Sequence, residues 1–176
     1  MRFLGRLLGG LVVLAVILVA VAFVLPRTIN VERQVEIGAP PEAIFPYVNS
    51  MQATAEWSPW LSLDPEVELT YSGPESGVGN TLAWSSENRR VGVGTQEITA
   101  SVENERVETA LDFGPMGTAD AYFVLEPAGE ATTVTWGFDS DLGMNPMARW
   151  MGLMMDGMVG GDYEAGLANL KAVVEG

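Results

Sequence analysis

The sequence predicts an apolar N-terminal helix followed by an α+β domain. This domain consists of an antiparallel sheet of about seven strands and a C-terminal helix. Three observations support this fold class. Residues 28–37 alternate between apolar and polar side chains with the period of a half-buried strand. Residues 67–140 contain β-forming runs separated by Gly, Pro and Asn clusters. Asn145 and Pro146 then open a helix-forming tail that continues to Glu175.

The N-terminal segment predicts a membrane anchor. Leu7 to Leu25 is a run of nineteen residues without a charge, and at about 1.5 Å per residue a helix of this length crosses a hydrocarbon core of about 30 Å. Arg2 and Arg6 precede the run, which predicts a cytoplasmic N-terminus. We therefore expect a single-pass transmembrane helix in residues 1–27, and an extracytoplasmic domain in residues 28–176 at the cell membrane, periplasmic if the cell is Gram-negative.

A cleaved signal peptide is the alternative interpretation. Residues 20–22, Ala-Val-Ala, satisfy the small-x-small rule for cleavage. The apolar run is longer than the roughly 7–15 residues of a signal-peptide core, and it continues past this position, which favours the anchor. Under both interpretations the domain is exported from the cytoplasm.

The charge of the domain argues against nucleic acid as a partner. After Arg27, six basic residues stand against twenty-three acidic ones, a net charge of −17. A phosphate backbone is bound by clustered Lys and Arg, and the only adjacent basic pair here is Arg89 and Arg90. Peripheral docking on anionic lipid headgroups is disfavoured for the same reason.

The composition narrows the possible chemistry. The chain has no cysteine and no histidine, which removes thiolate nucleophiles, imidazole bases and the usual zinc and iron ligands. Carboxylate, hydroxyl, amide and lysine groups remain. We predict no metal site, no cofactor and no specific catalytic residue.

Two short helices are expected after the first strand. Pro41 and Glu42 suit a first helical turn, where a missing N–H is harmless and the helix dipole favours a carboxylate. Pro46 within the segment and Pro59 beyond it argue against one long helix between residues 41 and 56. Short connections then predict a meander of six hairpin-linked strands. These strands are residues 67–72, 81–86, 91–102, 106–113, 118–126 and 132–140.

The apolar face of the C-terminal tail changes direction along the chain. Met147, Met151, Met154 and Met158 share one stripe, and a second stripe is rotated from it by roughly 150°. The second stripe consists of Tyr163, Leu167, Leu170 and Val174. We expect a break at residues 160–161, Gly-Gly, with Asp162 capping the second segment, so that each piece can turn its own stripe inward.

Several local sequences resemble the SRPBCC superfamily, which includes START lipid-binding domains and polyketide cyclases. VEIGAPPEAIF at 35–45 resembles its first strand and helix, and EWSPW at 56–60 with LDP at 63–65 resembles the polyketide-cyclase-like branch. YSGP at 71–74, LEP at 125–127 with TVTW at 133–136, and GLANLK at 166–171 add to the likeness, which spans about residue 28 to the C-terminus. The resemblance implies the helix-grip fold, in which a curved sheet and the C-terminal helix enclose a cavity.

The strand faces expected to turn inward are rich in large apolar side chains. These residues either line a cavity or fill a closed core. The inward sets are Val67, Leu69, Tyr71, Leu82, Trp84, Ile98, Val102, Val107, Leu111, Phe113, Phe123, Leu125, Val134, Trp136 and Phe138. The Met-rich stretch 144–158 suits an adaptable apolar lid as well as ordinary packing. We select twelve candidate ligand-binding residues from the inward sets, the short helices and this stretch. They are Trp57, Trp60, Tyr71, Trp84, Phe113, Phe123, Trp136, Phe138, Trp150, Met151, Met154 and Met158.

Two other patterns favour structural roles. Asp112, Asp120, Asp139 and Asp141 lie in or beside predicted strands, where a carboxylate pair would suit acid–base catalysis, but solvent-facing strand positions explain most of them. Two Gly-Val-Gly sequences, at 77–79 and 92–94, do not precede a helix as a phosphate-binding loop requires, and we interpret them as bends in a curved sheet.

The leading hypothesis is a membrane-tethered, non-enzymatic domain that binds a hydrophobic small molecule or lipid. One alternative is a polyketide-cyclase-like enzyme that uses carboxylate and hydroxyl groups. Another is a structural envelope protein with a filled core. The resemblance implies the fold but does not choose among these functions.

Overall fold

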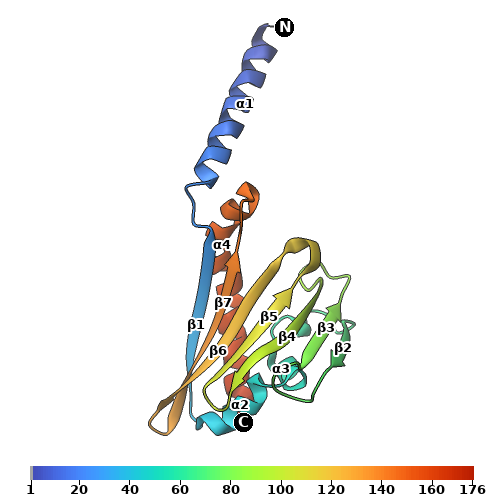
Figure 1. The fold of residues 1–176 in the computed structure, drawn as a ribbon, viewed down its shortest axis with the longest axis vertical. Coiled ribbons are helices and arrows are strands. Elements are labelled where there is room, and N and C mark those ends of the chain that lie inside the picture. Colours follow the sequence, from blue (N-terminus) through green and yellow to red (C-terminus); the bar gives the residue numbers. More distant parts are fainter. Residues whose placement is uncertain (1) are drawn as a thin grey trace.

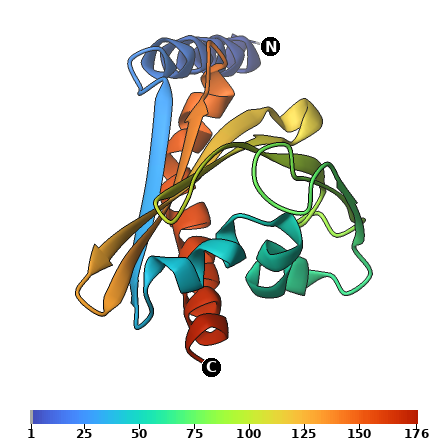
Figure 2. The ribbon, with the colours of Figure 1, turned by 60° about the horizontal axis from the view of Figure 1, so that its bottom comes forward.

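The computed structural model describes residues 2–176 and contains one antiparallel seven-stranded sheet in the order β1-β7-β6-β5-β4-β3-β2. The sheet curls, and α4 lies along one of its faces while α2 and α3 lie between α4 and the far strands (Figures 1 and 2). This is the predicted helix-grip arrangement. The helices are α1 Arg2–Ala22, α2 Pro41–Val48, α3 Met51–Trp57 and α4 Pro146–Glu175, with 3₁₀ turns η1 Leu61–Leu63 and η2 Gly114–Met116. The strands are β1 Thr28–Ile37, β2 Glu68–Ser72, β3 Thr81–Ser85, β4 Val93–Val102, β5 Arg106–Asp112, β6 Thr118–Ala128 and β7 Ala131–Asp141.

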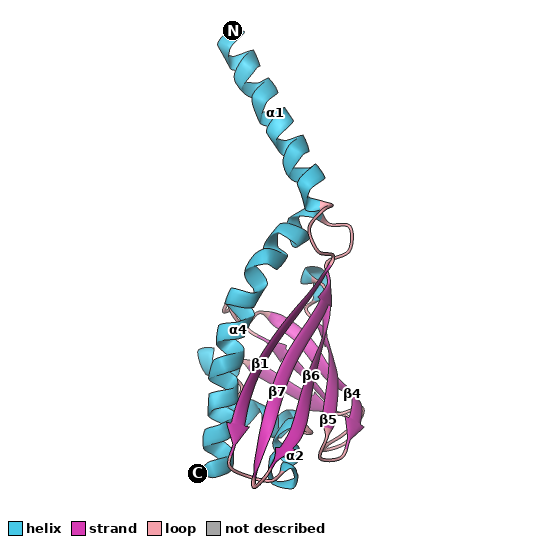
Figure 3. Cartoon of the chain, turned by 90° about the vertical axis from the view of Figure 1, so that its left-hand side faces the viewer, coloured by secondary structure: helices cyan, strands magenta, loops and turns pink. Residues whose placement is uncertain are grey.

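The N-terminal helix α1 points away from the domain (Figures 1 and 3). It ends at Ala22, and Phe23, Val24 and Leu25 form a turn and bend. Residues 7–22 of the uncharged run are helical. No helix within residues 2–176 has both the length and the apolar character of a membrane span. The predicted transmembrane helix is therefore not found.

The two short helices and the first strand form where the sequence predicts them. Pro41 occupies the start of α2 and Pro46 lies inside it, and α2 ends at Val48 before α3 begins at Met51. The strand β1 pairs along its full length with β7, from Thr28 opposite Asp141 to Ile37 opposite Thr132. Local sequence signals were therefore enough to predict where these elements lie.

The C-terminal helix α4 is continuous, so the predicted break at Gly160 and Gly161 is wrong. Asn145 caps the helix as predicted, since its Oδ1 accepts hydrogen bonds from the backbone N–H groups of Met147 and Ala148 at 3.0 and 3.3 Å. The predicted Met stripe is not buried: Met147, Met151, Met154 and Met158 are all exposed. The side chains of α4 that do face inward, from Met155 and Val159 through Tyr163 to Leu170, lie on one continuous face, so the helix has no need to break.

A contact from β1 explains the glycine at position 160. Arg33 lies on the inward face of β1, where it interrupts an otherwise apolar series, and its guanidinium crosses α4 at Gly160. Its Nε donates to Glu164 Oε1 at 2.8 Å and its Nη1 to Asp156 Oδ1 at 3.0 Å. Asp162, expected to cap a second helix, instead accepts a hydrogen bond from Trp60 Nε1 at 3.1 Å.

A β-bulge changes the face of β4 near its end. The register between β4 and β5 shifts between Ile98 and Ala100, so Ser101 stands opposite the buried Val107. Ser101 Oγ then donates to Asn49 Oδ1 at 2.8 Å, and Val102, predicted to point inward, is 50% exposed. Strict alternation fails here because a bulge inserts one extra residue.

An aromatic cluster forms the centre of the core between the sheet, α3 and α4. Trp136 on β7 stacks on Tyr163 of α4 with ring centroids 3.9 Å apart. Trp57 and Phe123 pack against Trp136 with centroids 5.2 and 5.1 Å away. The cluster fixes α4 over the middle of the sheet and closes this half of the interior.

Candidate functional site

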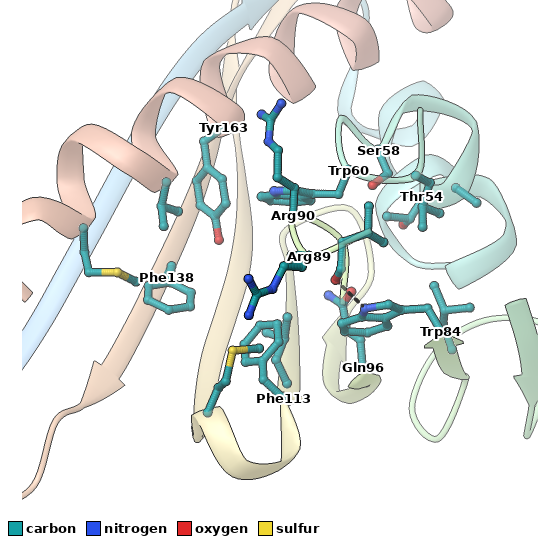
Figure 4. A pocket seen from close by; sticks show the side chains of 18 residues that line it. Thr54, Ser58, Trp60, Trp84, Arg89, Arg90, Gln96, Phe113, Phe138 and Tyr163 are labelled. Carbon is teal, nitrogen blue, oxygen red and sulfur yellow. Dashed lines mark hydrogen bonds between the residues drawn. The ribbon is translucent and has the colours of Figure 1, made fainter. Parts of the chain in front are cut away.

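The other half of the interior is hollow. A cavity of about 270 Å³ lies between α3, α4 and the inward faces of β3, β4 and β5, and it is open on one side (Figure 4). Its walls are mostly apolar. The apolar lining consists of Ala55, Trp60, Leu61, Leu82, Trp84, Val91, Leu111, Phe113, Met116, Phe138, Met155 and Val159.

Trp84 forms the wall on the side of the sheet. It stands opposite Gly94 in the register of β3 and β4, and a Cβ at position 94 would lie 2.5 Å from Trp84 Cζ2. Glycine at position 94 therefore lets the indole lie close against β4, with its Nε1 donating to the Val91 carbonyl at 3.2 Å and its ring edge-on to Phe113. The Gly-Val-Gly sequence at 92–94 thus makes room for a side chain in addition to shaping a turn.

Tyr163 forms part of the opposite wall. Its ring is held between Trp136 and Trp60, and the side chain is only 3% exposed. Its hydroxyl group points into the cavity (Figure 4) and makes no hydrogen bond with any of residues 2–176. Burial raises the pKa of the Tyr163 phenol well above its usual range. The neutral hydroxyl is therefore free to donate to or accept from a molecule in the cavity.

The polar groups of the cavity are few. Thr54 Oγ1 donates to the Tyr47 carbonyl at 3.3 Å, and Gln96 Nε2 donates to Thr109 Oγ1 at 3.0 Å, so both side chains have partners within the protein. No Asp or Glu side chain is among the described residues that line this cavity, and within residues 2–176 no cluster of three or more metal-binding side chains occurs. The cavity thus offers apolar contact and hydroxyl groups rather than paired carboxylates.

The carboxyl groups with shifted pKa values do not line the cavity. A hydrogen bond from Ser86 lowers the pKa of Asp64, and hydrogen bonds from Arg33 lower that of Asp156. The Arg27 guanidinium lowers the pKa of Asp141 to about 2. Each of these groups is held as a carboxylate, whereas a general acid needs a raised pKa.

Arg89 and Arg90 lie at the mouth of the cavity, on the loop between β3 and β4. In Figure 4, Arg89 extends toward Phe113 and Arg90 extends past Trp60 toward α4. Both residues are exposed. The rim of an apolar cavity in this acidic domain therefore carries two positive charges.

Four of the twelve predicted site residues line the cavity: Trp60, Trp84, Phe113 and Phe138. Trp57, Phe123 and Trp136 belong to the closed aromatic core, and Tyr71 packs against that core from β2. The structure does not bring the remaining four to the cavity. These are Trp150, Met151, Met154 and Met158, on the exposed first half of α4.

Several lining residues were not predicted, although the sequence carries a signal for them. Met155, Val159 and Tyr163 lie at four-residue intervals, so they form one face of α4 that continues across Gly160. This face was not predicted because the Met stripe was expected to turn inward instead. Arg89 and Arg90 were identifiable as the only adjacent basic pair of the domain, but nothing local placed their loop at a cavity.

Comparison with known proteins agrees with the fold. The family described as polyketide cyclase / dehydrase and lipid transport matches residues 28–175. The solution structure of the Aha1 dimer from Colwellia psychrerythraea is similar, with 21% identity, 84% of this chain and 96% of that chain covered, and a TM-score of 0.56. Truncated norcoclaurine synthase from Thalictrum flavum has 12% identity, covers 84% of this chain and 93% of that chain, and gives a TM-score of 0.64.

The crystal structure of Ara h 8.0201 has 15% identity, with 84% of this chain and 97% of that chain covered and a TM-score of 0.57. At these identities the likeness shows the fold alone. No curated protein sequence matches the chain significantly. Since the family match covers the sheet, the cavity and α4, the chain belongs to the polyketide cyclase/dehydrase and lipid-transport family of the SRPBCC superfamily.

Proposed function

We propose that the domain binds a hydrophobic small molecule or acyl chain in the cavity between α4 and strands β3 to β5. The observation that carries the proposal is the apolar, carboxylate-free lining of a cavity of about 270 Å³. An apolar cavity of about 150 Å³ is large enough to bind benzene. The cavity is therefore large enough for a molecule bigger than a single aromatic ring or longer than a short alkyl chain.

The comparisons support this proposal at the level of the family. Its description includes lipid transport. Norcoclaurine synthase, which shares the fold, has been solved in complex with dopamine and hydroxybenzaldehyde. Small molecules with an apolar body are thus the class of ligand to test first.

Binding of decanol to the full chain tests the proposal. Because α1 is apolar, the protein is kept in phosphatidylcholine nanodiscs, and calorimetric titrations are corrected with empty nanodiscs. Leu111→Trp and Val159→Phe fill the cavity from the sheet and from α4. Val102→Trp adds the same indole on the exposed face of β4 and serves as the matched control.

We expect the wild type and Val102→Trp to bind decanol, and both cavity-filling variants to lose binding. Absence of binding to the wild type would overturn the proposal. So would equal binding by the wild type and by folded Leu111→Trp and Val159→Phe, because the ligand would then lie elsewhere.

We further propose that α1 holds the domain at a membrane, on the extracytoplasmic side. The support is exposed apolar surface rather than helix length: Leu7, Leu8, Leu11, Leu14 and Ile17 are each more than half exposed. An apolar surface of this extent on a helix requires a covering. The first acidic residue of the chain is Glu32, so no carboxylate opposes insertion, and Arg2 and Arg6 favour a cytoplasmic N-terminus.

The end of α1 is also joined to the exposed Met-rich half of α4. Arg149 donates to the carbonyls of Phe23 and Gly143 at 3.2 and 3.0 Å, and Trp150 Nε1 donates to the Leu18 carbonyl at 3.1 Å. The exposed methionines of α4 therefore lie on the part of the domain nearest to α1 (Figure 3). A lipid surface that binds α1 would therefore also contact the exposed methionines of α4.

Cysteine labelling tests this location, because the chain has no native cysteine. Ser76→Cys places an exposed thiol on the domain, and Phe3→Cys places one near the N-terminus. We expect a membrane-impermeant maleimide to label Ser76→Cys in intact spheroplasts and to label Phe3→Cys only after lysis. The reverse pattern, or recovery of the chain in the soluble fraction after lysis, would contradict the proposal.

A further inference from the structure

The two arginines at the mouth of the cavity have no counter-charge within the protein. Neither the Arg89 nor the Arg90 guanidinium makes an ion pair or hydrogen bond with any of residues 2–176. The other cations of the domain are engaged. Arg33 and Arg106 pair with carboxylates, Lys171 lies 3.6 Å from Glu175, and Arg149 donates to backbone carbonyls.

This lack of partners is unexpected in so acidic a domain. Twenty-three carboxylates stand against six cations after Arg27, and the other four of these cations all have partners. No Asp or Glu lines the cavity beside Arg89 and Arg90. The two charges are therefore available to an anion that comes from outside.

The loop that carries the pair is held in place by hydrogen bonds. Ser86 Oγ donates to Asp64 Oδ2, and Asn88 Nδ2 donates to the Leu63 carbonyl at 3.2 Å, which joins the loop to η1. The Arg90 N–H donates to Asn88 Oδ1 at 3.0 Å, and Trp84 holds the Val91 carbonyl. The rim therefore keeps its shape without a ligand, which lowers the cost of ordering it on binding.

We infer that the ligand is an amphiphile with an anionic carboxylate or phosphate head at Arg89 and Arg90 and an apolar body in the cavity. This inference rests on the proposed binding function and specifies its ligand. Guanidinium groups match carboxylate and phosphate oxygens with paired hydrogen bonds. The apolar body of the ligand contacts Trp84 and Phe113. The unpartnered Tyr163 hydroxyl can hydrogen-bond to a polar atom farther along that body.

A set of probes with one tail and different heads tests the inference. Decanoate, decyl phosphate, decanol and decyltrimethylammonium are titrated, each below its micellar concentration, into the full chain in phosphatidylcholine nanodiscs. Inorganic phosphate is titrated separately to test the head alone. The variant is Arg89→Gln/Arg90→Gln. Its control, Arg27→Gln/Arg106→Gln, makes the same change in net charge at residues that do not line the cavity.

We expect the wild type to bind decanoate or decyl phosphate about tenfold more tightly than decanol, the effect of one charged hydrogen-bonded contact. Decyltrimethylammonium should bind most weakly, and inorganic phosphate should not bind measurably. The preferred head identifies the natural head as carboxylate or phosphate. Arg89→Gln/Arg90→Gln should lose the preference while keeping its decanol affinity, and the control should keep both.

The failures of the two proposals are distinguishable. If no probe binds the wild type, the proposed binding function itself fails. If decanol binds as tightly as decanoate and decyl phosphate, or if the preference survives in the folded double variant, the anionic head is wrong and the hydrophobic site remains. Should the double variant fail to fold, salt titration of the wild type decides, because only a charged head loses affinity as salt rises.

Discussion

The Arg33 guanidinium occupies the space that a side chain at Gly160 would need. A Cβ at position 160 would lie 2.0 Å from Arg33 Nη2 and 2.5 Å from Cζ. Arg33 is kept there by its bonds to Asp156 and Glu164, four residues before and after Gly160 on α4. The glycine therefore lets β1 reach across the helix, and the helix continues without a break through it.

Gly160→Ala should accordingly stabilise the protein less than the same change one residue later. Ala is about 1 kcal/mol more favourable than Gly inside a helix, and a Cβ at Gly161 meets nothing within 4 Å. Gly161→Ala should therefore raise the free energy of unfolding by about 1 kcal/mol. Gly160→Ala should give little or none of this gain, because it displaces Arg33 from both carboxylates. Denaturant unfolding of the full chain measures both.

A double-mutant cycle isolates the cause. In an Arg33→Ala background the space over α4 is empty, so Gly160→Ala should recover the stabilisation of about 1 kcal/mol. If Gly160→Ala instead stabilises the wild type as much as Gly161→Ala does, the Arg33 contact does not limit this position.

Gly94→Ala should damage both the sheet and the cavity. Its Cβ would lie 2.5 Å from Trp84 Cζ2 and 2.8 Å from the Asp112 carbonyl oxygen, and overpacking of this kind costs about 1–3 kcal/mol. The displaced indole should also reduce decanol affinity. Thr95→Ala, at the adjacent exposed position, should change stability by less than about 0.5 kcal/mol. Unchanged stability and binding in Gly94→Ala would contradict the close Trp84 contact.

The bulge in β4 predicts unequal losses of stability for two similar residues. Ile98 is fully buried, so Ile98→Ala should lower the free energy of unfolding by about 2–5 kcal/mol. Val102 lies beyond the bulge and is 50% exposed, so Val102→Ala should cost less than about 1 kcal/mol. Without the bulge, both side chains would face the core and both changes would be costly. Chemical denaturation curves of the two variants separate these outcomes.

Acid should destabilise the protein partly through Asp141. Arg27 and the Gly143 N–H hold the pKa of this carboxyl at about 2 in the folded state, below its ordinary value of 3.8. A depressed pKa gives stability that is complete above the unfolded pKa and is lost as the pH falls through the folded one. Wild-type stability should therefore fall more steeply than that of Asp141→Asn between about pH 5 and pH 2. Thermal unfolding across this range checks it, and parallel curves would show that the Arg27 pair contributes nothing.

Local signals predicted most of the elements. The alternation of residues 28–37 predicted β1 with its observed bounds, Pro41 predicted the start of α2, and Asn145 predicted the cap of α4. Each of these signals acts within a few residues, so the sequence carries it without reference to the fold.

The candidate site could be predicted only in part, because it depends on which of several apolar faces meet. Trp60, Trp84, Phe113 and Phe138 were expected to line a cavity and do so. Trp136 has the same alternation as Phe138 on β7 but is covered by Tyr163. Alternation assigns a side chain to a face of the sheet, and packing against α3 and α4 decides whether that position is filled or left open.

The sequence by itself determined the class of the fold, the strand faces and the excess of negative charge, because these follow from the period of apolar residues and from a count of ionisable groups. Tertiary structure alone decided that α4 is continuous, that β4 changes face at a bulge, and that a cavity remains beside the aromatic core under a rim with two unpaired arginines. Each of these features arises between residues far apart in the chain, such as Arg33 with Gly160 or Trp84 with Phe113, and no local pattern encodes such a meeting.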